Sequence, residues 1–274
     1  MYRSVWNSFN ESVCSLNYYS RKDIQFFRSS GFRYENYLIV DSCKEVIDRA
    51  SYVLINFSSN DPCNINRSVC FTMREFRKRL INMGNGMDGV LILPIKFDEL
   101  RSVPAVKYDC KSLSYIGTPI AILSYSRKIS QLYLKTGMIS SYLDIRGDKL
   151  ILIESSFETG NSGSPLINAV TGKVIGVIID CFPSPAQNHK KLKNIIEENI
   201  RILNDASGKT VVGEMDPAQV MSASQHMIKH LAKEIYLSAN RNFGFALPVE
   251  RISRHIKHME HKSQFTTLDK TRIE

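Results

Sequence analysis

The stretch that decides the fold is Thr159-Gly160-Asn161-Ser162-Gly163-Ser164-Pro165-Leu166, which Val174-Ile175-Gly176-Val177-Ile178 follows closely. Glycines on both sides of Ser162 free the backbone, so the hydroxyl can project from a tight turn while nearby N–H groups converge. Pro165 stops any helix, and the β-branched run that begins at Val174 favours a buried strand. The stretch indicates either a nucleophile on a turn or a plain strand-connecting loop, because Gly-x-Ser-Gly alone is a common pattern.

The composition is that of an ordinary globular protein. The 274 residues suffice for one large or two medium domains, and the 43% hydrophobic and 23% charged content is typical of soluble chains. The net charge of +9 is spread over several basic runs, which are usually solvated helix faces. Because the chain shows no aromatic-rich binding motif, nucleic acid or an anionic surface ranks last among the expected partners.

Nothing in the sequence indicates export, a membrane or a metal. The first residues contain no apolar signal region, and no window approaches about 18 uninterrupted apolar residues. The six cysteines form no C-x-x-C pair and no zinc-type spacing. We therefore expect a cytoplasmic protein with free thiols, without a membrane segment, a metal or a cofactor.

The residue patterns divide the chain into a β-rich part and a helical interruption. Short strand signals such as Tyr37–Val40, Tyr52–Phe57 and Gly89–Leu93 recur through the first 150 residues, which is typical of an all-β barrel or sandwich. After Cys181, helical spacing predicts helices over 189–203 and 218–239. A strand signal then returns, so a helical excursion of roughly 60 residues interrupts a β-protein.

Four blocks resemble the trypsin-like serine peptidases of the chymotrypsin fold, nearest to the HtrA/Deg type. In chain order they are Ser30-Gly31-Phe32 with Tyr37–Val40, Met87–Ile92, Gly137–Ser140 with Gly160–Pro165 and Gly172–Gly176, and Gly244–Pro248. The resemblance covers most of residues 11–180 and 243–260, and its serine block is highly specific.

The resemblance implies a mostly β fold of two six-stranded β-barrels, with the active site in the cleft between them. The expected parts are an N-terminal barrel half (1–110), a C-terminal barrel half with a terminal helix (111–180 and 243–262), a helical hairpin insertion (181–242) and a flexible tail (263–274). Whether the insertion only stabilises the fold, or covers the cleft or binds a partner, stays open.

The resemblance also assigns roles to residues. It makes Ser162 the nucleophile and Asp88 the residue that orients the base, with the backbone N–H groups of Gly160 and Ser162 as the oxyanion hole. Asn161 stands where zymogen-activated relatives have an aspartate that pairs with a newly cut N-terminus, so activation by such cleavage is not expected.

An extended peptide would bind by strand addition at the end of the strand that follows the serine turn. The expected substrate-binding residues there are Ile179, Asp180 and Cys181.

The general base is missing from the expected place. A serine hydroxyl needs a base within hydrogen-bond reach, and in this family the base is a histidine shortly after the strand that matches Tyr37–Val40. That position falls on or beside Cys43, and a thiol cannot replace an imidazole held by a carboxylate. All six histidines follow Ser162 in the chain: His189, His226, His230, His255, His258 and His261.

Other uses of these side chains are weaker readings. His189 reaches Ser162 from the opposite side in one alternative, and Cys43 acts as a nucleophile in another. A third alternative is a metal held on one helix face by His255, His258 and His261. Each is less favoured than a structural or solvated role for the same side chains.

The sequence therefore predicts a catalytically inactive trypsin-like homologue, a pseudoprotease. Its expected partner is a protein or peptide, bound in the cleft between the barrels or on the helical insertion. The alternative is an active serine endopeptidase whose base is unconventional or supplied by a partner.

Overall fold

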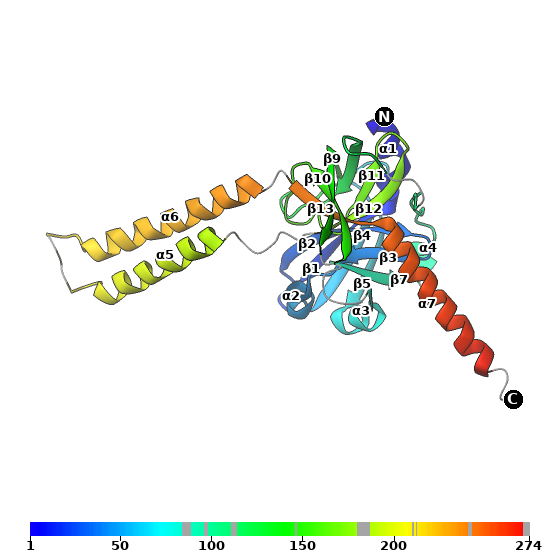
Figure 1. Ribbon diagram of the computed structural model, residues 1–274. Coiled ribbons are helices and arrows are strands. Elements are labelled where there is room, and N and C mark those ends of the chain that lie inside the picture. Colours follow the sequence, from blue (N-terminus) through cyan, green and yellow to red (C-terminus); the bar gives the residue numbers. More distant parts are fainter. Residues whose placement is uncertain are drawn as a thin grey trace. The chain divides into compact units, whose positions relative to one another are not determined.

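The protein is described by a computed structural model (Figure 1). The described residues are 1–83, 89–95, 98–110, 114–145, 147–179, 187–209, 211, 213–240 and 243–270. The chain divides into two compact units, one made of Met1–Cys181 with Phe243–Glu274 and the other of Phe182–Asn242. In the part of the chain that the structure describes, no helix is both long and apolar enough to cross a membrane.

The N-terminal half is a seven-stranded antiparallel sheet with the order β5-β4-β1-β2-β3-β7-β6 (Figure 1). Its strands are β1 (Val13–Tyr19), β2 (Gln25–Tyr34), β3 (Tyr37–Asp41), β4 (Tyr52–Ser58), β5 (Ile65–Thr72), β6 (Ile81–Asn82) and β7 (Val90–Pro94). The resemblance implied six strands closed into a barrel. Within the described residues the seventh strand is the two-residue β6, and the edge strands β5 and β6 do not pair with each other.

The C-terminal half is a closed six-stranded barrel with the order β10-β13-β12-β11-β8-β9, as the resemblance implied. Its strands are β8 (Pro119–Ser124), β9 (Tyr133–Ile145), β10 (Asp148–Glu154), β11 (Pro165–Asn168), β12 (Lys173–Ile179) and β13 (Phe243–Pro248). Strand β13 pairs with both β10 and β12, although the helical unit separates it from them in sequence. The predicted mostly β fold class is therefore confirmed.

Short helices and one long helix complete this unit. They are α1 (Tyr2–Phe9), the 3₁₀ helix η1 (Asn10–Ser12), α2 (Lys44–Arg49), α3 (Met73–Arg79), α4 (Asp98–Arg101) and α7 (Val249–Lys270). Thr72 and Glu75 form a capping box at the start of α3, which supplies partners for the free N–H groups of its first turn.

An apolar core joins the two halves. Phe32 and Ile39 of the N-terminal sheet are fully buried in the same cluster as Leu123 and Val177 of the barrel. Side chains of α1 and α7 join this cluster, including Ile252, which is also fully buried. Since burial of this kind is the main stabilising term in folding, the surface where the halves meet is fixed.

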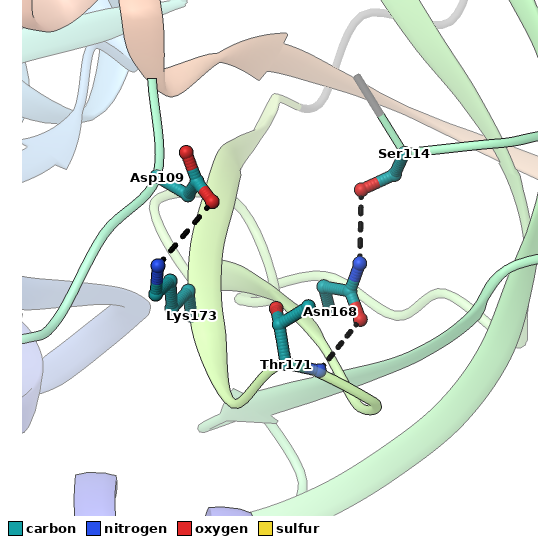
Figure 2. Close-up of polar contacts among 5 residues, drawn as sticks. All are labelled: Asp109, Ser114, Asn168, Thr171 and Lys173. Atoms are coloured by element: carbon teal, nitrogen blue, oxygen red, sulfur yellow. Dashed lines mark hydrogen bonds and ion pairs between the residues drawn. The ribbon is translucent and has the colours of Figure 1, made fainter. Parts of the chain in front are cut away.

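The connection between the halves is held against the β11–β12 turn. Asp109 donates its N–H to the carbonyl of Val174 at 3.0 Å, and its carboxylate lies 3.5 Å from the Lys173 ammonium. Figure 2 shows this pair beside Asn168, whose amide donates to Ser114 at 3.0 Å and accepts from the N–H of Thr171 at 3.1 Å. These contacts anchor the connecting segment to the barrel.

The second unit is a helical hairpin. It consists of α5 (Gln187–Ala206) and α6 (Pro217–Asn240), which pack against each other as antiparallel neighbours (Figure 1). Asp216 begins α6 by accepting hydrogen bonds from Gly208, Ser207 and Ala218. These bonds lower the pKa of its carboxyl group, because they stabilise the ionised form.

Candidate functional site

The serine turn, residues 155–164, connects β10 to β11 and is bonded to the next strand. The N–H of Gly163 donates to the carbonyl of Ile178 at 2.9 Å, and the N–H of Ile178 donates to the carbonyl of Ser164 at 2.9 Å. Gly160 and Gly163 have φ angles of +108° and +84°. Only glycine adopts such angles without strain, so the two glycines give the turn its shape.

The same turn docks on the N-terminal half. The N–H of Ser30 in β2 donates to the carbonyl of Ser162 at 3.1 Å, and its hydroxyl donates to the carbonyl of Gly160 at 2.8 Å. A Cβ atom added to Gly163 would lie 2.0 Å from the carbonyl oxygen of Ser30 and 3.0 Å from the nitrogen of Asp41. Gly163 therefore permits the close approach of the two halves.

The Ser162 hydroxyl donates a hydrogen bond to Oδ1 of Asp41 at 2.8 Å. Both side chains are buried, with 4% of Ser162 and 6% of Asp41 exposed. Asp41 is the last residue of β3, so its position follows from the pairing of β3 with β2 and β7. The N-terminal half thus presents a carboxylate to the serine.

Asp41 also acts on a buried tyrosine. Tyr18 of β1 is 2% exposed, and burial followed by the negative charge of Asp41 raises the pKa of its phenol group. Because Asp41 is itself buried, the hydrogen bond from Ser162 compensates part of the lost hydration of the carboxylate.

Of the two residues at the expected positions of the base and its orienting partner, the structure describes Cys43 but not Asp88. Cys43 lies two residues after Asp41 at the N-cap of α2, and its half-buried side chain packs against the core of the N-terminal half. Asp88 lies outside the described residues, although the next residue, Gly89, accepts a hydrogen bond from the N–H of Ser42 at 3.1 Å. The roles assigned to Asp88 and Cys43 therefore stay predictions.

Asn161 sits at the centre of a buried polar network. It is 2% exposed, and its amide group donates to Ser124 Oγ at 2.7 Å, to the Tyr133 hydroxyl at 2.7 Å and to the Tyr125 carbonyl at 3.2 Å. Ser124 also accepts from Ser164 at 2.8 Å. No sequence pattern marks Ser124 as part of this site, because a serine at the end of an apolar strand carries no signal for a distant partner.

Lys135 completes this network with a cation. Its ammonium donates to Oδ1 of Asn161 at 2.9 Å and to the carbonyl of Ser156 at 2.9 Å, and it lies 5.3 Å from the centre of the Tyr133 ring. Asn161 Oδ1 also accepts from the N–H of Glu158 at 2.8 Å. An internal lysine therefore holds the residue before Ser162, and the turn is formed without a free N-terminus.

Strand β12, which was expected to bind substrate, already exchanges backbone hydrogen bonds with the serine turn at Ile178. Ile179 is buried and pairs with Phe245 of β13. Asp180 and Cys181 lie outside the described residues, so their substrate-binding role is untested, and so is the oxyanion role of Gly160 and Ser162.

The histidines with described side chains lie on two helices. His226 and His230 belong to α6, and His255, His258 and His261 belong to α7. His189 lies in α5, and its side chain is outside the described part. Within the described residues, no three His, Cys, Asp or Glu side chains are arranged to hold a metal ion.

A cavity of about 490 Å³ opens beside the end of β3. Its lining includes Ser42, which directly follows Asp41, together with Lys44, Asp48, Arg77 and Asn82. The Arg77 guanidinium lies 3.5 Å from the Asp48 carboxylate. The cavity therefore lies where the chain leaves β3, and its lining carries charges of both signs.

Comparison with known proteins gives a family-model match and structural neighbours. Residues 30–177 match the model of the trypsin-like peptidase domain. No curated protein sequence is significantly similar to the chain. The active form of the Rv3671c protease from M. tuberculosis superposes with a TM-score of 0.52 and 13% identity, covering 92% of this chain and 82% of the other.

Two further structures are similar. A serine-to-alanine mutant of Rv3671c from M. tuberculosis in its inactive form has a TM-score of 0.51 and 13% identity, covering 94% of this chain and 90% of the other. The serine endoprotease from Yersinia pestis has a TM-score of 0.49 and 17% identity, covering 66% and 58%.

The family model spans more than half of the chain, from the Ser30 contact in β2 through the serine turn into β12. The closed barrel and the second sheet agree with the fold of the M. tuberculosis protease. The chain therefore belongs to the trypsin-like peptidase family.

Proposed function

We propose that this protein is a catalytically inactive member of the family that binds an extended protein segment beside its serine turn. One observation carries the proposal: the Ser162 hydroxyl is bonded to the buried carboxylate of Asp41 at 2.8 Å, and no histidine precedes Ser162 in the chain. The hydroxyl is thereby held by an acceptor that is poorly suited to remove its proton.

The chemistry of a carboxylate explains the expected loss of activity. A carboxylate is intrinsically a weaker base than the histidine that the family uses, so proton transfer from Ser162 to Asp41 is less favourable than transfer to an imidazole. If Asp41 stays ionised, it repels an oxyanion that forms roughly 4–5 Å away by about 3–4 kcal/mol at an effective dielectric constant of about 20. This repulsion alone lowers the rate by a factor of roughly 10²–10³.

The cavity beside β3 supports the binding part of the proposal. Among the described lining residues, Lys44 and Arg77 give it two cationic groups and Asp48 gives it one carboxylate, while Leu80 and Val90 contribute apolar lining. A mixed lining of this kind suits a peptide with acidic and apolar side chains. Its lining includes Ser42, the residue that follows Asp41 in the chain.

Activity-based labelling tests the catalytic part. We expect that a fluorophosphonate probe does not label the wild-type protein above the level of Ser162→Ala and that casein is not digested. Robust labelling of Ser162 together with casein turnover would overturn the proposal. The variant Cys43→His is made alone and together with Asp41→Ala. It tests whether an imidazole in the segment between β3 and α2 restores the labelling that wild type lacks.

Binding is measured separately. Fluorescein-labelled casein, an acidic unfolded chain, is titrated with the protein and followed by anisotropy. We expect Lys44→Glu to weaken binding at least about fivefold, or roughly 1 kcal/mol. Lys22→Glu makes the same charge change at an exposed site outside the cavity lining and should bind like wild type. Equal binding of casein by both variants would exclude the cavity as the binding site.

The same hydrogen bond supports a second candidate, an active endopeptidase that uses Asp41 as its base. The distance of 2.8 Å satisfies the geometric requirement for proton transfer. In that case Asp41→Asn abolishes turnover while Ser162 and the fold are retained. Absence of turnover by wild type across a pH series excludes this candidate.

A further inference from the structure

The helical hairpin has a defined inner side and register. Glu197 of α5 and Lys229 of α6 form an ion pair at 2.8 Å, and Ser222 donates to Oδ1 of Asn204 at 2.9 Å. Ile196 and Ile200 of α5 are buried against α6. These contacts show which residues of the two helices lie opposite each other.

Much apolar surface remains outside this inner side. Nine large apolar side chains of the hairpin are between 44% and 69% exposed: Leu192, Ile195, Ile202, Val220, Met221, Met227, Ile228, Leu231 and Ile235. Isolated exposed apolar residues are common on protein surfaces, but a contiguous patch usually marks an interaction site.

The spacing of these residues makes them contiguous. In α6, Met221, Ile228 and Ile235 follow one another at seven-residue intervals, so they form a stripe along one side of the helix. In α5, Ile195 and Ile202 form a second stripe next to the inner side. We name the surface formed by the nine side chains the hairpin face.

The register places the two stripes at overlapping levels of the hairpin. Glu197 lies beside Lys229 and the helices are antiparallel, so Ile195 lies at the level of Leu231. Asn204 lies beside Ser222, so Ile202 lies at the level of Ser224, between Met221 and Ile228. The hairpin face therefore runs along both antiparallel helices, as does the apolar surface of one half of a four-helix bundle.

We propose that a second copy of this chain covers the hairpin face, so that two hairpins form an antiparallel four-helix bundle. At roughly 60 Å² of exposed carbon surface for each of the nine side chains, the face offers about 500 Å² of apolar area. A stable interface buries about 800 Å² per partner, of which about 60% is apolar. The available area thus matches what a stable dimer requires.

The order of residues along each helix fits a twofold axis that crosses the helices near Ile228. Rotation about this axis places α5 against α5 and α6 against α6, each pair antiparallel. Met221 of one copy then lies opposite Ile235 of the other, and Ile228 lies near its own equivalent. Exposed Lys191 lies opposite Asp205 of the other copy, so charges of opposite sign face each other at the edge of the bundle.

The mixed charges along this edge also favour a protein partner over a lipid surface. Helices that lie in a membrane interface carry mainly Lys and Arg beside their apolar face. Here Glu198 and Asp205 follow Lys191 at seven-residue intervals, and all three are exposed.

Light scattering after size-exclusion chromatography of the full chain tests the proposal. We expect twice the chain mass for wild type at about 50 µM, since a dimer dissociation constant of about 1 µM or below keeps most of the protein paired at that concentration. Ile195→Glu with Ile228→Glu should give the single-chain mass. Asn194→Glu with His226→Glu adds the same two acidic side chains outside the hairpin face and should remain dimeric. Equal helical circular dichroism of the variants shows that the hairpin itself is intact.

Oxidative cross-linking tests the position of the twofold axis. Ile228→Cys should form a covalent dimer well above the wild-type background, whereas Ile235→Cys, which lies opposite Met221 of the other copy, should not. The proposal is wrong if wild type has the single-chain mass or if the double glutamate variant is still a dimer. It is also wrong if wild type, but not that variant, binds to phosphatidylcholine–phosphatidylserine vesicles. Equal cross-linking of Ile228→Cys and Ile235→Cys would overturn it as well.

Discussion

The serine turn and the corner between β3 and α2 meet at one hydrogen bond but are held in different ways. The turn is fixed by Gly163, by the network around Asn161 and by contacts with Ser30 of the other half. The corner supplies Asp41 from a strand end, and Cys43 follows two residues later at the N-cap of α2. The turn belongs to the interface between the halves, so the fold requires it whether or not the corner supports catalysis.

The largest expected effect tests whether the turn is structural. Gly163→Ala places a Cβ atom 2.0 Å from the Ser30 carbonyl oxygen at a φ of +84°, so the two halves would have to separate locally. We expect the free energy of unfolding, measured with urea, to fall by at least about 3–5 kcal/mol. Gly172→Ala has a φ of +64° but open space around the new Cβ, so it should cost only about 1–2 kcal/mol. Equal losses would show that the docking of the turn is unimportant.

Removal of the serine hydroxyl tests how the two regions are joined. Ser162→Ala leaves the buried Asp41 carboxylate without this donor, and the loss of a hydrogen bond to a charged group costs about 1.5–3 kcal/mol. The exposed control Ser156→Ala should change stability by less than about 0.5 kcal/mol. A stabilised Ser162→Ala protein would indicate the strain of a working active site, contrary to a structural role of this hydrogen bond.

The smallest effect concerns the cation that holds Asn161. Lys135→Met keeps much of the aliphatic length but removes the hydrogen bonds to Asn161 and Ser156, so we expect a loss of about 1–1.5 kcal/mol, reduced because the lysine is partly exposed. Lys128→Met, at an exposed position, should be neutral within about 0.5 kcal/mol. Thermal unfolding of both variants measures the difference in stability. An unchanged unfolding midpoint for Lys135→Met would show that this lysine does not stabilise the turn.

The sequence predicted the serine side of the site better than the base side. Gly160, Ser162 and Gly163 form a local pattern, because the turn needs glycines at fixed positions next to the serine. Asp41 directly follows the predicted strand Tyr37–Val40, yet nothing local marks it as the partner of Ser162. The two residues are 121 positions apart, and only the docking of β3 against the barrel brings them together.

The sequence alone determined the trypsin-like fold, the serine on its glycine-framed turn, the absence of a histidine before Ser162 and the presence of a helical interruption. These features depend on local periodicity and on motifs in order along the chain, which neighbouring residues encode. The tertiary structure decided which side chain accepts the Ser162 hydroxyl, that Lys135 holds Asn161, and which apolar residues of the hairpin remain exposed. Those outcomes depend on contacts between distant strands and between paired helices, which no local pattern specifies.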